Sequence, residues 1–180
     1  DAPLEALALA NMGDPKRAHR LADTMPNDCV LCLRVHGRID AAEHNWSGAA
    51  WWFARAESAA PSLPLPDSDW GAMLLRAGRY DDAIAKFTLA NRKGPHFADP
   101  LEMWGEALIA KNRSDLALGK FEEADKYAPN WGRLHLKWGE ALLWSGKRGD
   151  AQKQFAIGAH LDLSAADKTA LARVSTVPNG

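Results

Sequence analysis

The chain has 180 residues, of which 47% are hydrophobic and 25% charged, and its formal net charge is −1. This composition fits a soluble globular domain or a short repeat array and argues against disorder. The balanced charge gives no basic surface for nucleic acid, and the longest apolar stretches are too short to span a bilayer. The first residue is Asp1 rather than Met, so we expect a segment to precede it in the native protein. The absence of a visible signal peptide slightly favours the cytoplasm.

The first sixty residues are expected to form two pairs of helices. A helix start at Asp14, directly before a proline, predicts a first pair over about 3–24. A second pair is predicted over about 28–59, with a turn at 37–42 and a long second helix that ends before the PSLPLP segment. We interpret residues 1–60 as two degenerate repeats.

Residues 64–163 carry a repeat of 34 residues. Trp-Gly pairs recur at 70–71, 104–105 and 138–139. Three further columns keep this spacing: Leu74, Leu108 and Leu142; Ala83, Ala117 and Ala151; and Phe87, Phe121 and Phe155. Each copy places apolar residues at helical spacing on two successive helices. Helix ends are expected at Gly78, Asn112 and Gly146, residues that tolerate the left-handed conformation.

A helix–turn–helix unit of this length and pattern resembles the tetratricopeptide repeat (TPR) family, closely so over residues 64–163. The resemblance implies an all-α fold, an α-solenoid of antiparallel helix pairs wound as a right-handed superhelix. Three tandem repeats (64–97, 98–131 and 132–163), a capping helix (164–174) and a tail (175–180) are expected. The Trp of each copy stands where the family usually has Leu, and we expect it to be a large core residue.

Cys29 and Cys32 form the motif most suggestive of redox or metal chemistry, since a cysteine near a helix N-terminus has a lowered thiol pKa. A zinc site usually needs two such pairs, and thioredoxin-like chemistry expects a preceding strand. An alignment of Gly37 with Gly78 places both cysteines in core columns. We therefore expect two buried structural thiols, with a redox or metal protein as the less favoured alternative.

No motif predicts catalysis, a bound cofactor or a metal. The six histidines are scattered without metal-binding spacing, and P-loop, GxSxG and GxGxxG patterns are absent from the sequence. We therefore expect a protein that is not an enzyme, with no catalytic, cofactor-binding or metal-binding residues.

The densest aromatic patch lies at residues 46–53. Trp46 and Phe53 share the apolar face of the predicted helix, whereas Trp51 points away from it and Trp52 lies to the side. An exposed Trp is an interface candidate, so Trp51 and Trp52 form a possible second interface. The alternative is that this long helix is buried on two sides.

In the TPR family, the first helices of successive repeats line a concave groove that binds peptides or protein segments. By column, the resemblance places ten residues in this groove: Asp69, Ala72, Arg76, Glu102, Met103, Glu106, Arg133, Lys137, Glu140 and Trp144. Their mixed charge suits a segment of mixed charge. Some members of the family clamp a C-terminal carboxylate in this groove. We expect no such clamp here, because its positions in the first and second repeats hold Ser68, Ala72 and Met103. Trp144 is the best anchor candidate, unless it packs under the C-terminal helix.

Together these features predict a non-enzymatic scaffold for protein–protein interaction, whose protein or peptide partner is unknown. Nucleic acid and membrane insertion are not expected. Two alternatives stay open: a structural solenoid that forms a homo-oligomer, and a chaperone of secretion type that binds an unfolded client.

Overall fold

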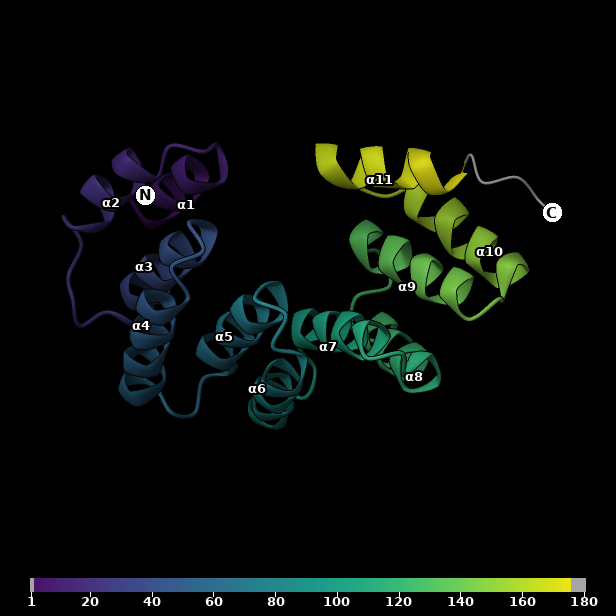
Figure 1. Ribbon diagram of the computed structural model, residues 1–180, viewed down its shortest axis with the longest axis horizontal. Helices are drawn as coiled ribbons and strands as arrows, with labels where there is room; N and C mark the ends of the chain where they lie inside the picture. Colours follow the sequence, from purple (N-terminus) through teal and green to yellow (C-terminus); the bar gives the residue numbers. More distant parts are fainter. Residues whose placement is uncertain (1, 176–180) are drawn as a thin grey trace. The chain divides into compact units, whose positions relative to one another are not determined.

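The computed structural model describes residues 2–175, which form only helices and the turns between them. The helices are α1 (Ala2–Asn11), α2 (Pro15–Ala22), α3 (Val30–Ala42), α4 (Trp46–Ala59), α5 (Pro64–Arg76), α6 (Tyr80–Lys93), α7 (Ala98–Ala110), α8 (Ser114–Asp125), α9 (Gly132–Trp144), α10 (Arg148–Ala159) and α11 (Ala165–Ser175). Successive helices up to α10 pack as antiparallel pairs (Figure 1), which confirms the predicted all-α class. Within the described range, no helix is long and apolar enough to cross a membrane.

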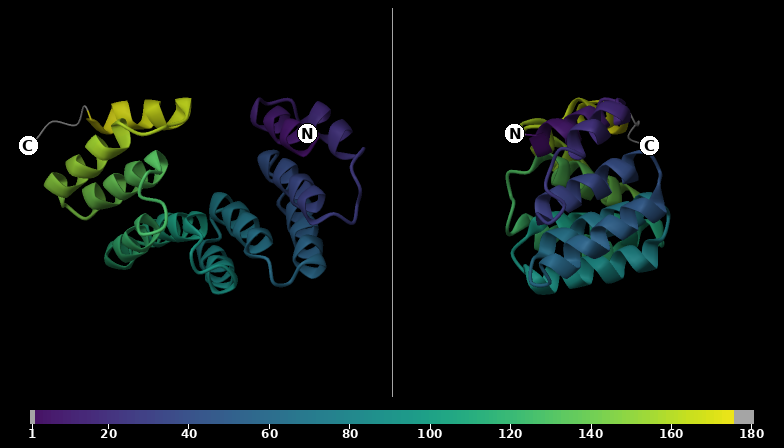
Figure 2. Two further views of the ribbon diagram at one scale, coloured as in Figure 1. Left: turned by 180° about the vertical axis from the view of Figure 1, so that it is seen from behind. Right: turned by 90° about the vertical axis from the view of Figure 1, so that its left-hand side faces the viewer.

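Helix contacts divide the chain into two compact units, residues 1–95 and residues 96–180. In the first unit, α3 contacts α1, α2 and α5 as well as its partner α4 (Figure 2). In the second unit, α9 contacts α7, α8 and α11 as well as its partner α10. This division does not test the repeat boundaries expected at residues 64, 98 and 132, which stay a prediction. Part of the expected tail, residues 176–180, lies outside the described residues.

A glycine in the first helix of each pair from α3 onward packs against a phenylalanine of the second helix. A Cβ atom on Gly105 would lie 2.7 Å from the Cζ atom of Phe121, closer than packed carbon atoms approach. The same contact recurs in three further pairs: Gly37 with Phe53, Gly71 with Phe87, and Gly139 with Phe155. The 34-residue register therefore extends one repeat further upstream than we expected from the sequence, to α3 and α4.

The turn expected at residues 37–42 is wrong, because these residues continue helix α3. The helix ends instead before His44, which has a positive φ of 61°. The equivalent positions of the later repeats are Gly78, Asn112 and Gly146, all with positive φ. Those three are the helix ends that the sequence predicts, because glycine and asparagine are the usual residues at such an end.

The repeated tryptophans are half-buried rather than core residues, which corrects the expectation from the sequence. In the first two copies, the exposed ring face is covered by a lysine of the paired helix. The Nζ atom of Lys86 lies 3.8 Å from the ring centroid of Trp70, and that of Lys120 lies 4.2 Å from the centroid of Trp104. The core of these repeats instead contains the phenylalanines, which are at most 7% exposed.

Cys29 and Cys32 form a disulfide, so the expectation of two buried structural thiols is wrong. Cys29 is the N-cap of α3, and its Sγ atom accepts a hydrogen bond from the backbone N–H of Cys32 at 3.0 Å. Only Cys32 is buried, in a core shared with α1 and α2, while Cys29 is half-buried. In the corrected register Cys29 matches the N-cap residues of the later first helices, Leu63, Phe97 and Trp131.

Candidate protein-interaction site

The predicted groove residues of the second unit lie on two neighbouring first helices. Helix α7 carries those from the middle repeat, α9 carries those from the last one, and the two helices are in contact. Residues three or four apart share one side of a helix, so the charged side chains come together. We call this set the α7–α9 face, which comprises Glu102, Glu106, Arg133, Lys137, Glu140 and Trp144. Met103 lies half-buried on the same helix as Glu102.

A network of ion pairs connects α7 with α9 and α11. Arg133 Nη2 donates a hydrogen bond to Glu106 Oε1 at 2.7 Å, and Arg133 Nη1 lies 3.5 Å from Asp167 Oδ1 in α11. Lys137 Nζ donates to Glu140 Oε2 at 3.0 Å and lies 3.5 Å from Glu106 Oε2. Because these groups are partly shielded from water, the network orders the side chains of the face.

Glu102 is 1% exposed, and neither of its carboxyl oxygens has a hydrogen-bond partner. Arg133 Nε lies 3.3 Å from Glu102 Oε1, within ion-pair distance but outside hydrogen-bonding geometry. Burial, and then the negative charge of Glu106, raises the pKa of Glu102 well above its usual range. A protonated Glu102 can donate a hydrogen bond to Glu106, whereas the ionised form lacks a donor. Burying a carboxyl group that lacks a hydrogen-bond donor when ionised destabilises the fold, and such groups are candidates for functional residues.

The two cations of the face stay charged. Burial lowers the pKa of Lys137, but the charge of Glu106 and the hydrogen bond to Glu140 outweigh it, so the pKa is raised. Burial also lowers the pKa of Arg133, but the nearby carboxylates outweigh this effect, so the pKa is raised. Two fixed positive charges therefore lie among four acidic groups: Glu102, Glu106, Glu140 and Asp167.

Trp144 is 78% exposed. The alternative that it packs under the C-terminal helix is therefore wrong. Its ring borders a small cavity of about 90 Å³, which Ile109, Lys137 and Glu140 also line. An exposed tryptophan beside a cavity and charged groups has the composition of a binding anchor.

In the first unit, the predicted groove residues lie on α5. Asp69 Oδ2 accepts a hydrogen bond from Arg34 Nε of α3 at 2.7 Å, and both side chains are largely buried. Ala72 is half-buried and Arg76 is exposed. Arg34 was not expected here. It stands 34 residues before Ser68, so the register of the repeat is the signal that could have found it.

A second surface of the first unit surrounds Trp51, which is 55% exposed and therefore not buried on both sides. Trp52 is half-buried and stacks on His36 with ring centroids 4.3 Å apart. The guanidinium carbon of Arg55 lies 4.8 Å from the ring centroid of Trp51. Trp51 and Arg55 border an open hollow of about 570 Å³, also lined by Leu33.

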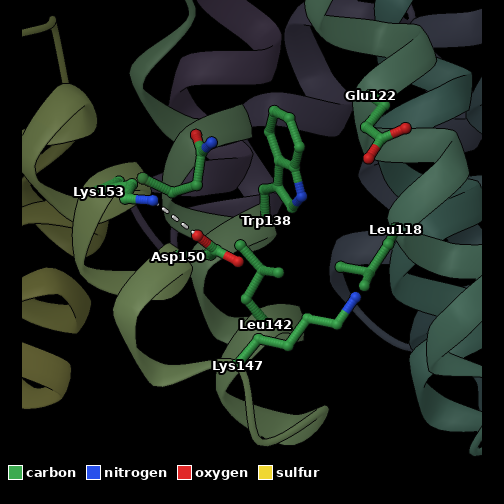
Figure 3. A pocket seen from close by; sticks show the side chains of 8 residues that line it. Leu118, Glu122, Trp138, Leu142, Lys147, Asp150 and Lys153 are labelled. Carbon is green, nitrogen blue, oxygen red and sulfur yellow. Dashed lines mark hydrogen bonds and ion pairs between the residues drawn. The ribbon is translucent and has the colours of Figure 1, made fainter.

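Another cavity of the second unit, of about 210 Å³, is lined from α8, α9 and α10 (Figure 3). Trp138 and Gln154 both line it, and Gln154 stands where the preceding repeats have a lysine over the indole. Gln154 Oε1 lies instead 2.7 Å from the ring Nδ1 atom of His135, a hydrogen bond. In Figure 3, Lys153 pairs with Asp150 of its own helix at 2.9 Å, so these charges partly neutralise one another.

Solved structures of TPR proteins match almost the whole chain. YrrB, a TPR protein with an unusual peptide-binding site, is 14% identical with a TM-score of 0.66, covering 96% of this chain and 89% of YrrB. PilF of Pseudomonas aeruginosa is 15% identical with a TM-score of 0.74, covering 97% of this chain and 82% of PilF. TTC0263, a TPR protein of Thermus thermophilus, is 20% identical with a TM-score of 0.72, covering 81% of each chain.

No protein-family model and no curated protein sequence matches the chain. The structural likeness confirms that the chain has the TPR fold, as its 34-residue repeat predicts. This fold typically serves as a scaffold for protein–protein interaction.

Proposed function

We propose that the chain is a non-enzymatic interaction module that binds a peptide or protein segment on the α7–α9 face. The observation that carries this proposal is Trp144, whose ring is 78% exposed next to an ordered cluster of charges. Tryptophan is enriched among the residues that dominate binding energy, and Trp144 stands beside a cavity and charged groups, as a binding anchor does.

The charges of the face indicate the chemistry of the segment. With Glu102 protonated, the carboxylates of Glu106, Glu140 and Asp167 surround two cations, which leaves an excess of negative charge for a positively charged side chain. Glu106 and Glu140 are partly exposed, so their carboxylates can accept hydrogen bonds from a lysine or arginine of the segment. We therefore expect the segment to combine a basic residue with an apolar residue that contacts Trp144.

Selection from a phage-displayed library of random peptides tests this function. Peptides enriched on the wild-type chain are synthesised, and their dissociation constants are measured with folded Trp144→Ala and Lys137→Glu variants. Loss of an anchoring tryptophan weakens binding by about 10-fold or more. The matched control is Lys153→Glu, an exposed lysine of α10 outside the face, which should bind like wild type. Unchanged affinity in both face variants contradicts the proposal.

A second candidate function is self-association through the surface around Trp51. The exposed indole and the stacked Arg55 favour it, because these two residue types are enriched in interfaces. Light scattering at high micromolar concentration tests it. A dimer that Trp51→Ala converts to a monomer supports this role, whereas a wild-type monomer counts against it.

A further inference from the structure

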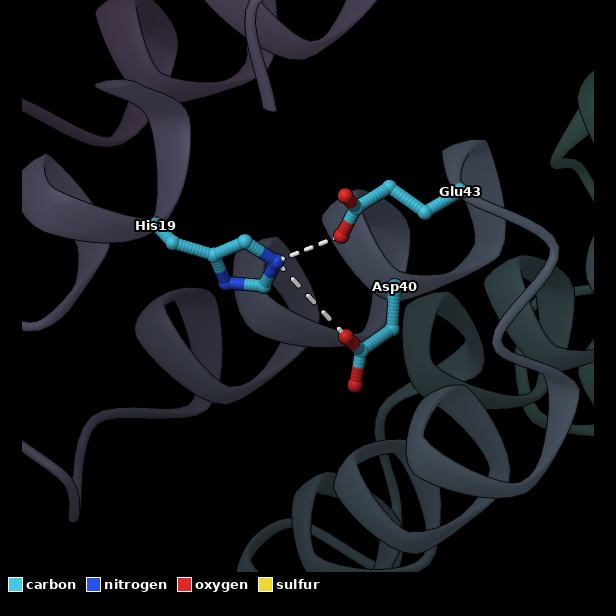
Figure 4. A group of neighbouring side chains, drawn as sticks. All are labelled: His19, Asp40 and Glu43. Atoms are coloured by element: carbon cyan, nitrogen blue, oxygen red, sulfur yellow. Dashed lines mark hydrogen bonds and ion pairs between the residues drawn. The ribbon is translucent and has the colours of Figure 1, made fainter. Parts of the chain in front are cut away.

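His19, Asp40 and Glu43 bring three potential metal ligands together in the first unit (Figure 4). His19 lies on α2, Asp40 in the last turn of α3, and Glu43 is the C-cap of α3. Their nearest nitrogen and oxygen atoms all lie within 4.8 Å of one another. The cluster therefore spans the junction between the first helix pair and the second.

The distances suit a small divalent cation. His19 Nε2 lies 2.7 Å from Glu43 Oε2 and 3.8 Å from Asp40 Oδ1. Two ligands bound to one tetrahedral Zn²⁺ ion lie roughly 3.3 Å apart, given metal–ligand bonds of about 2.0–2.2 Å. The observed distances bracket this separation. Since His19 and Glu43 are about one-third exposed, small side-chain movements can close the site.

Asp40 is the residue that packing alone does not explain. The positions 34, 68 and 102 residues later in the repeat hold Leu74, Leu108 and Leu142, each at most 5% exposed. Asp40 is itself only 6% exposed, so an acidic group stands where three later repeats bury a leucine. This exchange removes apolar burial and desolvates a carboxylate, both of which destabilise the fold.

Neighbouring residues hold the Asp40 carboxylate in place. The side chain of Asn45 hydrogen-bonds to this carboxylate, and Asn45 Oδ1 accepts a hydrogen bond from the backbone N–H of Gly48 at 3.2 Å. A Cβ atom on Gly48 would clash with Asp40 Oδ2, so glycine leaves room for the carboxylate. Such support of a ligand by outer hydrogen bonds is typical of metal sites.

We propose that His19, Asp40 and Glu43 bind one Zn²⁺ ion, with water in the remaining position. A single imidazole with two carboxylates favours Zn²⁺ over Mg²⁺ and Ca²⁺, which prefer oxygen ligands throughout. The ion connects α2 to the end of α3. The buried residues that α1 and α2 themselves contribute to the core are alanines (Ala6, Ala10, Ala18 and Ala22), which bury little apolar area. Zinc therefore stabilises the first helix pair against the rest of its unit.

The test measures Zn²⁺ binding to the chain without an affinity tag, after removal of metal by a chelator. Equilibrium dialysis with micromolar Zn²⁺ should give one ion per chain, which excess Mg²⁺ does not displace. His19→Ala and Glu43→Gln should each weaken binding by about 10-fold or more, since even outer-sphere changes have effects of this size. The control is His160→Ala, an exposed histidine of the second unit, which should bind like wild type.

Asp40→Leu separates a metal site from a purely structural ion pair. This variant restores the leucine of the later repeats, so it should melt at or above the wild-type temperature without metal and bind no zinc. Zn²⁺ should also slow amide hydrogen exchange in α1 and α2 of the wild type, and not of Asp40→Leu. The absence of stoichiometric binding, or binding that His19→Ala and Glu43→Gln leave unchanged, would overturn the proposal.

Discussion

The aromatic ring of Phe121 lies directly on Gly105, so closely that a Cβ atom at residue 105 would come within 2.7 Å of Phe121 Cζ. The contact lets the two helices of a repeat approach each other, and it recurs in every helix pair from α3 to α10. The glycines that accompany the repeated tryptophans therefore define the spacing of the helices. The tryptophans themselves lie at the edge of the core.

Replacing Gly105 with alanine should destabilise the chain. The clash with Phe121 costs about 1–3 kcal/mol, as overpacking does in other cores. The matched control is Gly119→Ala in the interior of α8, where an added Cβ meets no atom within 4 Å. Alanine should stabilise that position by about 1 kcal/mol through its helix propensity. Chemical denaturation measures both, and equal stability of the two variants would contradict the packing described.

Part of the fold could be predicted because a few residue types reveal helix pairs directly. The spacing of Phe87, Phe121 and Phe155 is sufficient to indicate repeated helix pairs. The equivalent Gly37 and Phe53 are also in the sequence, but Gly37 lacks the tryptophan that precedes the later glycines. The helix end before His44 was not predicted, because histidine is a weaker signal for the left-handed conformation than the glycine or asparagine of the later repeats.

Glu102→Gln should make the chain more stable at neutral pH. The folded pKa of Glu102 is raised above its unfolded value, so its favourable contribution is complete below the unfolded pKa. It is lost as the pH rises through the folded pKa, because the buried carboxylate then ionises. Glutamine avoids this loss, with a gain of about 1 kcal/mol at neutral pH and little difference at acidic pH.

Denaturation curves across this pH range measure the effect of Glu102→Gln. Glu122→Gln, at an exposed position of α8, serves as the control and should leave the pH dependence unchanged. If Glu102→Gln instead destabilises the chain at neutral pH, Glu102 acts as an ionised structural partner of Arg133 rather than as a buried neutral acid.

The bond between Cys29 and Cys32 predicts that the unreduced chain, once denatured, contains no free thiol. Reduction should release two thiols and lower the free energy of unfolding by about 2 kcal/mol, since the closed loop is very short. The double variant Cys29→Ser, Cys32→Ser should not respond to reductant. Two free thiols in the unreduced chain would refute the disulfide.

Trp144→Ala should leave stability within about 0.5 kcal/mol of wild type, because the side chain is 78% exposed. Phe121→Ala, which removes a ring only 1% exposed, should cost about 3–5 kcal/mol in the same denaturation experiment. A large loss of stability in Trp144→Ala would mean that the indole supports the fold and is not available as an anchor.

The sequence could place the residues of the α7–α9 face but not their environment. Helical spacing and the repeat register bring Glu102, Glu106 and Lys137 to neighbouring first helices. That Glu102 is buried without a hydrogen-bond donor depends on the packing of α9 against α7, which no local pattern encodes. The sequence likewise did not predict the cluster of His19 with Asp40, because its ligands come from two helices that share no sequence motif.

Amide hydrogen exchange of the chain, with and without a peptide enriched by selection, tests the central claim most directly. Binding at the α7–α9 face predicts that the peptide slows exchange in α7 and α9, and that Trp144→Ala abolishes this protection at the same peptide concentration. Protection confined to α8 and α10, or to the surface around Trp51, would contradict binding at this face.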